Sequence, residues 1–206
     1  MPYCVGITGG IGSGKSRAAA MFGDMGAGVV DTDEISHQIT ASGGSAMPEI
    51  VAVFGPAAAA ADGSLDRAAM RRRIFGDPEA RRQLENILHP RIREVAHGQI
   101  RESTAPYVLL VGPLLLETGA YRDIIRRILV VDCDEALQVS RTIARSRLDE
   151  ASVRAIMAAQ ISRSERLARA DDIIRNDGGV DELRRQVAAL HGKYLELAAN
   201  EGQARA

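Results

Sequence analysis

Gly9-Gly10-Ile11-Gly12-Ser13-Gly14-Lys15-Ser16 decides the fold, because it matches the pattern G-x-x-x-x-G-K-[ST] at every defined position and follows the apolar run Tyr3 to Thr8. In this pattern the glycines let several backbone N–H groups converge on phosphates, and the following helix adds the positive end of its dipole. The lysine reaches the β- and γ-phosphates, and the hydroxyl of Ser16 coordinates Mg²⁺. The stretch therefore predicts a strand, a phosphate-binding loop and a helix, in that order.

Lys15 is informative because lysine is rare in this chain. The sequence contains 24 arginines and only two lysines, the other being Lys193. A compact ammonium fits a tight backbone loop and reaches phosphate oxygens, whereas the planar guanidinium of arginine needs more room. The residue favours a site for a nucleoside triphosphate over a glycine-rich turn that binds no ligand.

The composition is typical of a globular protein with one medium-sized domain. The 206 residues are 46% hydrophobic and carry a net charge of -1, so no global charge attracts nucleic acid or a membrane. Tyr107 to Leu116 is the longest apolar run and is shorter than the roughly 18 residues that span a bilayer. The first residues lack the features of a signal peptide. We expect a cytoplasmic monomer with no nucleic-acid or membrane partner, whose Cys4 and Cys133 are buried thiols without a metal role.

Five short segments predict strands, and each adjoins a helical pattern: Tyr3 to Thr8, Gly28 to Asp31, Tyr107 to Gly112, Arg127 to Asp132 and Asp172 to Ile174. The strands are continuously apolar rather than alternating, which indicates a parallel sheet covered on both faces. The predicted class is therefore α/β, with the three-layer P-loop NTPase fold and a five-stranded parallel sheet.

We expect one domain over residues 1–206, with a core formed by 1–33, 107–135 and 170–200. Residues 34–106 form a helical insertion that binds the substrate, and residues 136–169 form a helical lid. Helical patterns within the insertion cover Pro48 to Phe54, Arg67 to Phe75, Pro78 to Leu88 and Pro90 to Arg101. A last amphipathic helix is expected from about Val180 to Ala199, with a frayed tail beyond Asn200.

Asp31 and Asp33 follow the second strand. The carboxyl ends of parallel strands border the ligand crevice, so we expect these acids to face the phosphate loop of the neighbouring strand. If the strand continues, both point to the same side. Asp33 is then placed to accept the proton of a hydroxyl that attacks the γ-phosphate, and Asp31 to orient it or to hold a metal-bound water. The alternative is that one of them caps the helix that opens at Glu34.

The third strand ends in Gly112-Pro113, where many P-loop NTPases have a metal-binding aspartate. The metal would then depend on Ser16, the nucleotide's own oxygens, water and the pair Asp31 and Asp33. This arrangement suits a small-molecule kinase. The sequence also lacks an N-K-x-D motif, which disfavours a GTPase.

Arginines are frequent in the predicted lid, and Arg141, Arg145 and Arg147 form its first cluster. Guanidinium groups on a mobile segment stabilise the charge that phosphoryl transfer spreads over the equatorial oxygens. The alternative for each residue is a solvated pair with a nearby acid. His89, which stands before Pro90, fits a helix boundary better than a catalytic group.

The ordered motifs of the chain resemble those of the dephospho-CoA kinase family over essentially its whole length to Ala199. The motifs are Thr8 to Ser16, Asp31-Thr32-Asp33, Leu88-His89-Pro90, Pro113-Leu114-Leu115-Leu116-Glu117, Gln160-Ile161-Ser162-Arg163 and Ala170 to Gly178. Arg17 differs from the threonine usual in the family, and Leu116 from an aromatic residue or valine; neither touches a proposed catalytic atom.

The resemblance implies transfer of the γ-phosphate of ATP, with Mg²⁺, to the ribose 3′-hydroxyl of 3′-dephospho-CoA. It implies that Asp33 is the base and acts with Lys15 and Arg141, and that Ser16 contacts the metal. The residues implied to bind ATP are Gly10, Ile11, Gly12, Ser13, Gly14, Lys15, Ser16, Arg17, Arg145 and Asn176, the last near the adenine. Those implied on the acceptor side are Thr8, Asp33, His89, Pro113 and Leu114.

Two alternatives stay open on the residues alone. One is another P-loop kinase that acts on a different small alcohol, because the insertion sets the acceptor. The other is a regulatory module that binds ATP without catalysis. Asp33 discriminates against the second alternative, because a pure binding module has no need of a carboxylate at the γ-phosphate.

Overall fold

The computed structural model describes residues 1–113, 115–146 and 148–204. Leu114 and Arg147, both singled out by the sequence, lie outside the described residues. The chain divides into two compact units, one made of residues 1–30 and 99–206 and the other of residues 31–98.

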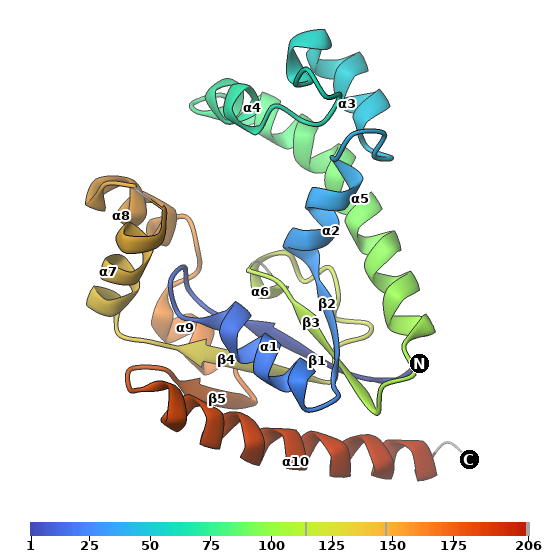
Figure 1. Ribbon diagram of the computed structural model, residues 1–206, viewed down its shortest axis with the longest axis vertical. Coiled ribbons are helices and arrows are strands. Elements are labelled where there is room, and N and C mark those ends of the chain that lie inside the picture. Colours follow the sequence, from blue (N-terminus) through green and yellow to red (C-terminus); the bar gives the residue numbers. More distant parts are fainter. Residues whose placement is uncertain (114, 147, 205–206) are drawn as a thin grey trace. The chain divides into compact units, whose positions relative to one another are not determined.

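The first unit is built on a sheet of five strands, which Figure 1 shows with its helices. The strands are β1 (Tyr3–Thr8), β2 (Gly28–Asp31), β3 (Tyr107–Val111), β4 (Arg127–Asp132) and β5 (Asp172–Arg175). Their order is β2-β3-β1-β4-β5, and β1 runs parallel to both β3 and β4, as β4 does to β5. The predicted α/β class with a five-stranded parallel sheet is confirmed.

The order of the strands corrects one expectation. The second strand is not the neighbour of β1, because β3 lies between them. Every residue of β3 is buried, whereas Val29 in β2 is 41% exposed. A strand buried on both faces is stabilised in the centre of a sheet, and a short strand with an exposed apolar residue is tolerated at the edge.

Helices cover both faces of this sheet. Figure 1 shows α1 (Lys15–Asp24) and α10 (Val180–Ala204) on the near face, and α6 (Leu115–Thr118) and α9 (Arg163–Ala168) beyond it. The region predicted as a lid forms α7 (Glu135–Ser146), α8 (Glu150–Ala158) and α9. The core between the sheet and the near helices includes Phe22, Tyr107 and Tyr194. The Tyr194 ring lies 6.0 Å from that of Phe22 and 5.6 Å from that of Tyr107.

A buried carboxylate fastens α10 to the sheet. Asp172 in β5 accepts hydrogen bonds from Arg127 Nε at 2.8 Å, Lys193 Nζ at 2.6 Å and Tyr194 Oη at 3.1 Å. Burial alone would raise the pKa of Asp172, but the bonds from Arg127 and Lys193 outweigh it and lower the pKa. The helix also continues to Ala204, so residues 201–204 are helical where a frayed tail was expected. Glu201 there pairs with Arg126 Nε at 3.2 Å.

The second unit is helical. It contains α2 (Thr32–Ile39), α3 (Met47–Phe54), a short 3₁₀ turn (Pro56–Ala58), α4 (Arg67–Ile74) and most of α5 (Pro78–Glu102). The helices α3, α4 and α5 begin within one residue of predicted helices, whereas α2 begins at Thr32, two residues before the expected start at Glu34. Asp66 caps α4 by accepting a hydrogen bond from the Ala69 N–H at 2.8 Å.

The break expected at His89 and Pro90 is wrong, because both residues lie inside α5. A proline within a helix removes one hydrogen bond and costs about 3 kcal/mol. Leu84 and Ile87 are buried before it and Ala96 after it. Each large aliphatic side chain contributes about 1.5–3 kcal/mol when fully buried, so packing on both sides of Pro90 offsets the loss.

Candidate active site

The loop between β1 and α1 curls through two glycines in the left-handed region. Gly12 has a φ of +75° and Gly14 a φ of +92°, which side chains rarely allow. The loop closes on itself where the Ser13 N–H donates to the Gly10 carbonyl at 3.1 Å. The Ser13 hydroxyl is buried and has no hydrogen-bond partner among the described residues. The predicted strand, loop and helix therefore occur in the expected order.

Neighbouring groups pack directly against the backbone of this loop. A Cβ atom added at Gly10 would lie 2.3 Å from Gln138 Oε1, and one at Gly12 would lie 2.4 Å from the Gln138 carbonyl oxygen. At Gly14 the nearest atom would be Asn176 Nδ2, at 2.2 Å. Any side chain at these positions would displace α7 or the segment after β5. Gln138 was not singled out in the sequence, because nothing local marks it as a neighbour of the loop.

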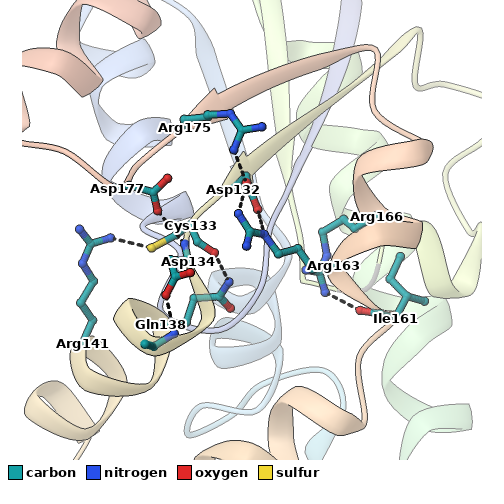
Figure 2. A network of polar contacts seen from close by, with 11 residues as sticks. Asp132, Cys133, Asp134, Gln138, Arg141, Ile161, Arg163, Arg166, Arg175 and Asp177 are labelled. Atoms are coloured by element: carbon teal, nitrogen blue, oxygen red, sulfur yellow. Dashed lines mark hydrogen bonds and ion pairs between the residues drawn. The ribbon is translucent and has the colours of Figure 1, made fainter.

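Asn176 and Arg141 join the loop through a chain of hydrogen bonds. Asn176 Nδ2 donates to the Ser13 carbonyl at 2.7 Å. The Asn176 carbonyl in turn accepts a hydrogen bond from Arg141 Nη1 at 2.8 Å, and the same nitrogen lies 3.2 Å from Cys133 Sγ. Figure 2 shows the contact between Arg141 and Cys133. The structure thus brings these two predicted residues to the phosphate loop, while Arg145 is exposed further along α7.

The remaining residues of the loop motif lie at the start of α1. Lys15 is its first residue and is half-buried, and Ser16 and Arg17 follow as exposed residues. The N–H groups of this first turn carry the positive end of the helix dipole. Phosphate oxygens are the groups that such an arrangement binds.

Thr8 and Pro113 connect the ends of β1 and β3. The buried Thr8 hydroxyl donates to the Pro113 carbonyl at 3.5 Å. The two residues therefore lie together at the carboxyl end of the sheet.

An acid that the sequence analysis did not identify lies at the end of β4. Asp132 is 3% exposed and accepts hydrogen bonds from Arg163 Nε at 2.7 Å and Arg163 Nη2 at 2.8 Å. Arg175 Nη1 lies 3.3 Å from its second oxygen (Figure 2). The Arg163 hydrogen bond holds the pKa of Asp132 below its ordinary value, and Asp132 raises the pKa of Arg163. A carboxylate that ends a buried strand is the sequence signal that could have found it.

Arg166 also escaped the sequence analysis as an individual residue. It lies in α9 and is 5% exposed, and its Nη2 donates to the Ile161 carbonyl at 2.9 Å. A Cβ at Gly10 would lie 3.3 Å from its Nη1. Burial lowers its pKa, and the charges of Glu117 and Asp132 act against that shift.

In the second unit, Asp31 caps α2. Its Oδ1 accepts hydrogen bonds from the N–H groups of Asp33 at 2.8 Å and Glu34 at 3.4 Å. The strand ends at Asp31, so the condition under which both acids would point to the same side is not met. The alternative that one acid is a helix cap is confirmed for Asp31, whose oxygen is engaged by the backbone.

Asp33 and His89 are both exposed in the second unit. Asp33, in the first turn of α2, borders an open depression together with Glu34, His37, Gln38 and Ala41. His89 lies within α5.

Both cysteines are buried, and burial raises the pKa of Cys4 to about 12 and also raises that of Cys133. Buried, protonated thiols behave as small apolar groups, as the sequence predicts.

Among the described residues, no group of three or more His, Cys, Asp or Glu side chains is placed to hold a metal ion. The helices within the same residues include none that is long and apolar enough to cross a membrane.

The buried pair of Asp132 and Arg163 generates a prediction about stability. Asp132→Asn removes the carboxylate that the Arg163 guanidinium binds through two nitrogens, and we expect a loss of roughly 2–3 kcal/mol in unfolding free energy at pH 7. This is less than the about 3–5 kcal/mol typical of fully buried pairs, because the Arg163 side chain is 30% exposed. Urea unfolding followed by circular dichroism measures the difference. The control is Asp181→Asn, whose carboxylate is 84% exposed.

The same variant has a defined pH dependence. The folded pKa of Asp132 lies below its ordinary value of 3.8, so its contribution is present above that value and is lost as the pH falls through the folded pKa. The stability difference between the native chain and Asp132→Asn should therefore shrink as the pH falls below about 4. A difference that stays constant from pH 7 to pH 3 would contradict the assignment.

Comparisons with known proteins agree with this geometry. The family model for dephospho-CoA kinase matches residues 3–182. A dephospho-CoA kinase from Chromobacterium violaceum is 56% identical over 191 residues, which cover 93% of this chain and 94% of the relative.

Two solved structures superpose over nearly the whole chain. One, from Thermus thermophilus, has a TM-score of 0.81 and 34% identity and covers 93% of this chain and 97% of its own. The other, a dephospho-CoA kinase from Campylobacter jejuni, has a TM-score of 0.70 and 25% identity. The match covers 95% of this chain and 98% of the Campylobacter chain. The family match and the phosphate loop lead to the same conclusion: this chain belongs to the dephospho-CoA kinase family.

Proposed function

We propose that this chain transfers the γ-phosphate of ATP to the ribose 3′-hydroxyl of 3′-dephospho-CoA, giving coenzyme A and ADP. This reaction is the final step of coenzyme A biosynthesis. The observation that carries the proposal is the left-handed glycine loop between β1 and α1, in a chain that matches its family over residues 3–182. We further propose that the enzyme acts as a cytoplasmic monomer on this small molecule, without a nucleic-acid partner.

The phosphate loop fits the triphosphate of ATP. Its glycines leave no room for a side chain beside Gln138 and Asn176, and the buried Ser13 hydroxyl has no hydrogen-bond partner among the described residues. Lys15 would bind the β- and γ-phosphates as a compact cation. Ser16 would hold Mg²⁺ through its hydroxyl, and the bound ion would neutralise charge that builds on the phosphates during transfer.

The acceptor is proposed to bind to the insertion formed by residues 34–106. Asp33 lies in the first turn of α2, two residues beyond the end of β2. A carboxylate in this place is a group that can accept the proton of the attacking hydroxyl. His89, Thr8 and Pro113 are proposed to contribute to the acceptor side.

Residues 136–169 are proposed to close over the nucleotide. Arg141 and Arg145 lie one helical turn apart on α7. Closure of such a segment excludes water and brings guanidinium groups to the transferring phosphate. Asn176 is proposed to lie at the adenine while its side chain holds the loop at Ser13.

The direct test is incubation with Mg-ATP and 3′-dephospho-CoA, followed by mass analysis of the acceptor. We expect a gain of one phosphate and release of one ADP per acceptor. ADP release with a different alcohol but not with dephospho-CoA would indicate another small-molecule kinase. ATP binding without any phosphorylated product would indicate a regulatory module.

Asp33→Asn should lower the turnover rate by about 10²-fold or more and leave the affinity for ATP nearly unchanged, because only the general base is lost. A coupled assay of ADP release measures turnover, and calorimetry measures binding. Asp24→Asn, an exposed acid at the end of α1, is the matched control and should retain the native rate. Native turnover in Asp33→Asn would remove Asp33 from the mechanism.

Lys15→Arg should weaken ATP binding roughly tenfold or more although the positive charge is kept, because a guanidinium is too large for the tight loop. The chain offers a matched control in its other lysine. Lys193→Arg keeps a cation beside Asp172 and should leave ATP affinity unchanged. Equal dissociation constants for Lys15→Arg and the native chain would show that the loop does not require a compact cation.

A further inference from the structure

The short segment between α8 and α9 is held on both sides by charged side chains. The Ile161 N–H donates to Glu117 Oε1 at 3.3 Å, and the Ile161 carbonyl accepts from Arg166 Nη2 at 2.9 Å. Figure 2 shows the second of these bonds. The two bonds fix the peptide on either side of Ile161 and with it the position of Gln160.

Unpartnered polar atoms gather around this segment and the phosphate loop. Arg166 Nε, Glu117 Oε2 and Ser13 Oγ are buried and lack a hydrogen-bond partner among the described residues. Buried polar atoms without partners are uncommon in native proteins and call for a functional explanation. Here they flank the loop that is built to hold phosphates.

Gln160 contacts the loop itself. The N–H of Ile11, the third residue of the phosphate loop, donates to Gln160 Oε1 at 3.2 Å. An N–H only donates, so the oxygen of the carboxamide must face the loop and the NH₂ group is the opposite end. The structure shows no partner for this Nε2 among the described residues. Gln160 therefore presents two oriented N–H donors beside the loop.

We propose that Gln160 is a further catalytic residue, whose Nε2 donates a hydrogen bond to an oxygen of the transferring γ-phosphoryl group. The α- and β-phosphates are cradled where the loop enters α1, and Ile11 lies on the arm that leaves β1. The Gln160 carboxamide is hydrogen-bonded to Ile11 in this part of the loop, and it can therefore reach the terminal phosphate. The inference rests on the proposed function in taking ATP as the phosphoryl donor.

In the transfer, the bond from the γ-phosphorus to the bridging oxygen of ADP breaks, and a bond to the acceptor hydroxyl oxygen forms. The hydroxyl proton passes to Asp33, and Gln160 gives up no proton. Negative charge spreads over the three equatorial oxygens as this occurs. A donor already fixed in place by Ile11, Glu117 and Arg166 stabilises that charge without reorganising.

The decisive variant is Gln160→Glu, which keeps an oxygen to accept from Ile11 but loses the donor. We expect turnover to fall about 10²-fold or more, as when a single oxyanion donor is removed. We also expect the preference for ATP over ADP, measured as the ratio of dissociation constants, to fall roughly tenfold. Gln160→Met, whose side chain is uncharged and of similar length, should also lower both turnover and the preference for ATP over ADP. Gln203→Glu makes the same chemical change in an exposed residue of α10 and serves as the control.

The outcomes separate a catalytic role from a structural one. Native turnover and an unchanged ratio in Gln160→Glu would overturn the proposal. Equal weakening of ATP and ADP binding would also overturn it, since that result means that Gln160 only shapes the loop. Circular dichroism checks that each variant is folded. The ratio involves no acceptor, so it tests Gln160 even if the native chain fails to phosphorylate dephospho-CoA, a failure that would count against the proposed function alone.

Discussion

Direct packing of polar groups onto the backbone of three loop glycines is the constraint on which the site depends. Gly10 and Gly12 leave no room for a Cβ beside Gln138, and Gly14 leaves none beside Asn176. Gln138 comes from α7, after β4, and Asn176 follows β5. These contacts form only if β4 lies next to β1 and β5 next to β4. The geometry of the phosphate site therefore depends on the order of the strands in the sheet.

Asp132 extends this requirement to α9, whose Arg166 also lies beside Gly10. Its carboxylate holds Arg163 at the start of α9 and Arg175 at the end of β5. With α9 fixed in this way, Arg166 lies against Gly10 and binds the Ile161 carbonyl. A buried ion pair is weak evidence for net stability, since desolvation offsets much of the attraction. The effect of this pair is to orient α9. The segment that precedes α9 contains Gln160, which contacts the loop.

The sequence was a reliable guide where the signal is local. All five strands begin and end within one residue of the segments predicted for them, and β1, β2 and β4 match at both ends. A central strand buried on both faces is continuously apolar, which makes it recognisable in the sequence. The loop was predictable because its glycines and Lys15 are consecutive. The pair of Asp132 and Arg163 was not predictable, since it depends on which helix start lies beside the end of β4. Two predictions failed because burial outweighs local preferences. The sequence placed β2 beside β1, but the fully buried β3 lies there. It also predicted a break at Pro90, where the packing of Leu84 and Ile87 keeps α5 continuous.

The distribution of cations around the loop explains why a lysine survives in an arginine-rich chain. The guanidinium of Arg141 binds the Asn176 carbonyl, and that of Arg163 binds Asp132 through two nitrogens. A planar fork suits such contacts within the protein, where two acceptors or a flat carboxylate must be matched. A compact ammonium suits a ligand that enters and leaves a narrow cradle. Arg141 binds the Asn176 carbonyl through Nη1, and the remaining N–H groups of its guanidinium can serve its proposed role in closure while that bond positions the side chain.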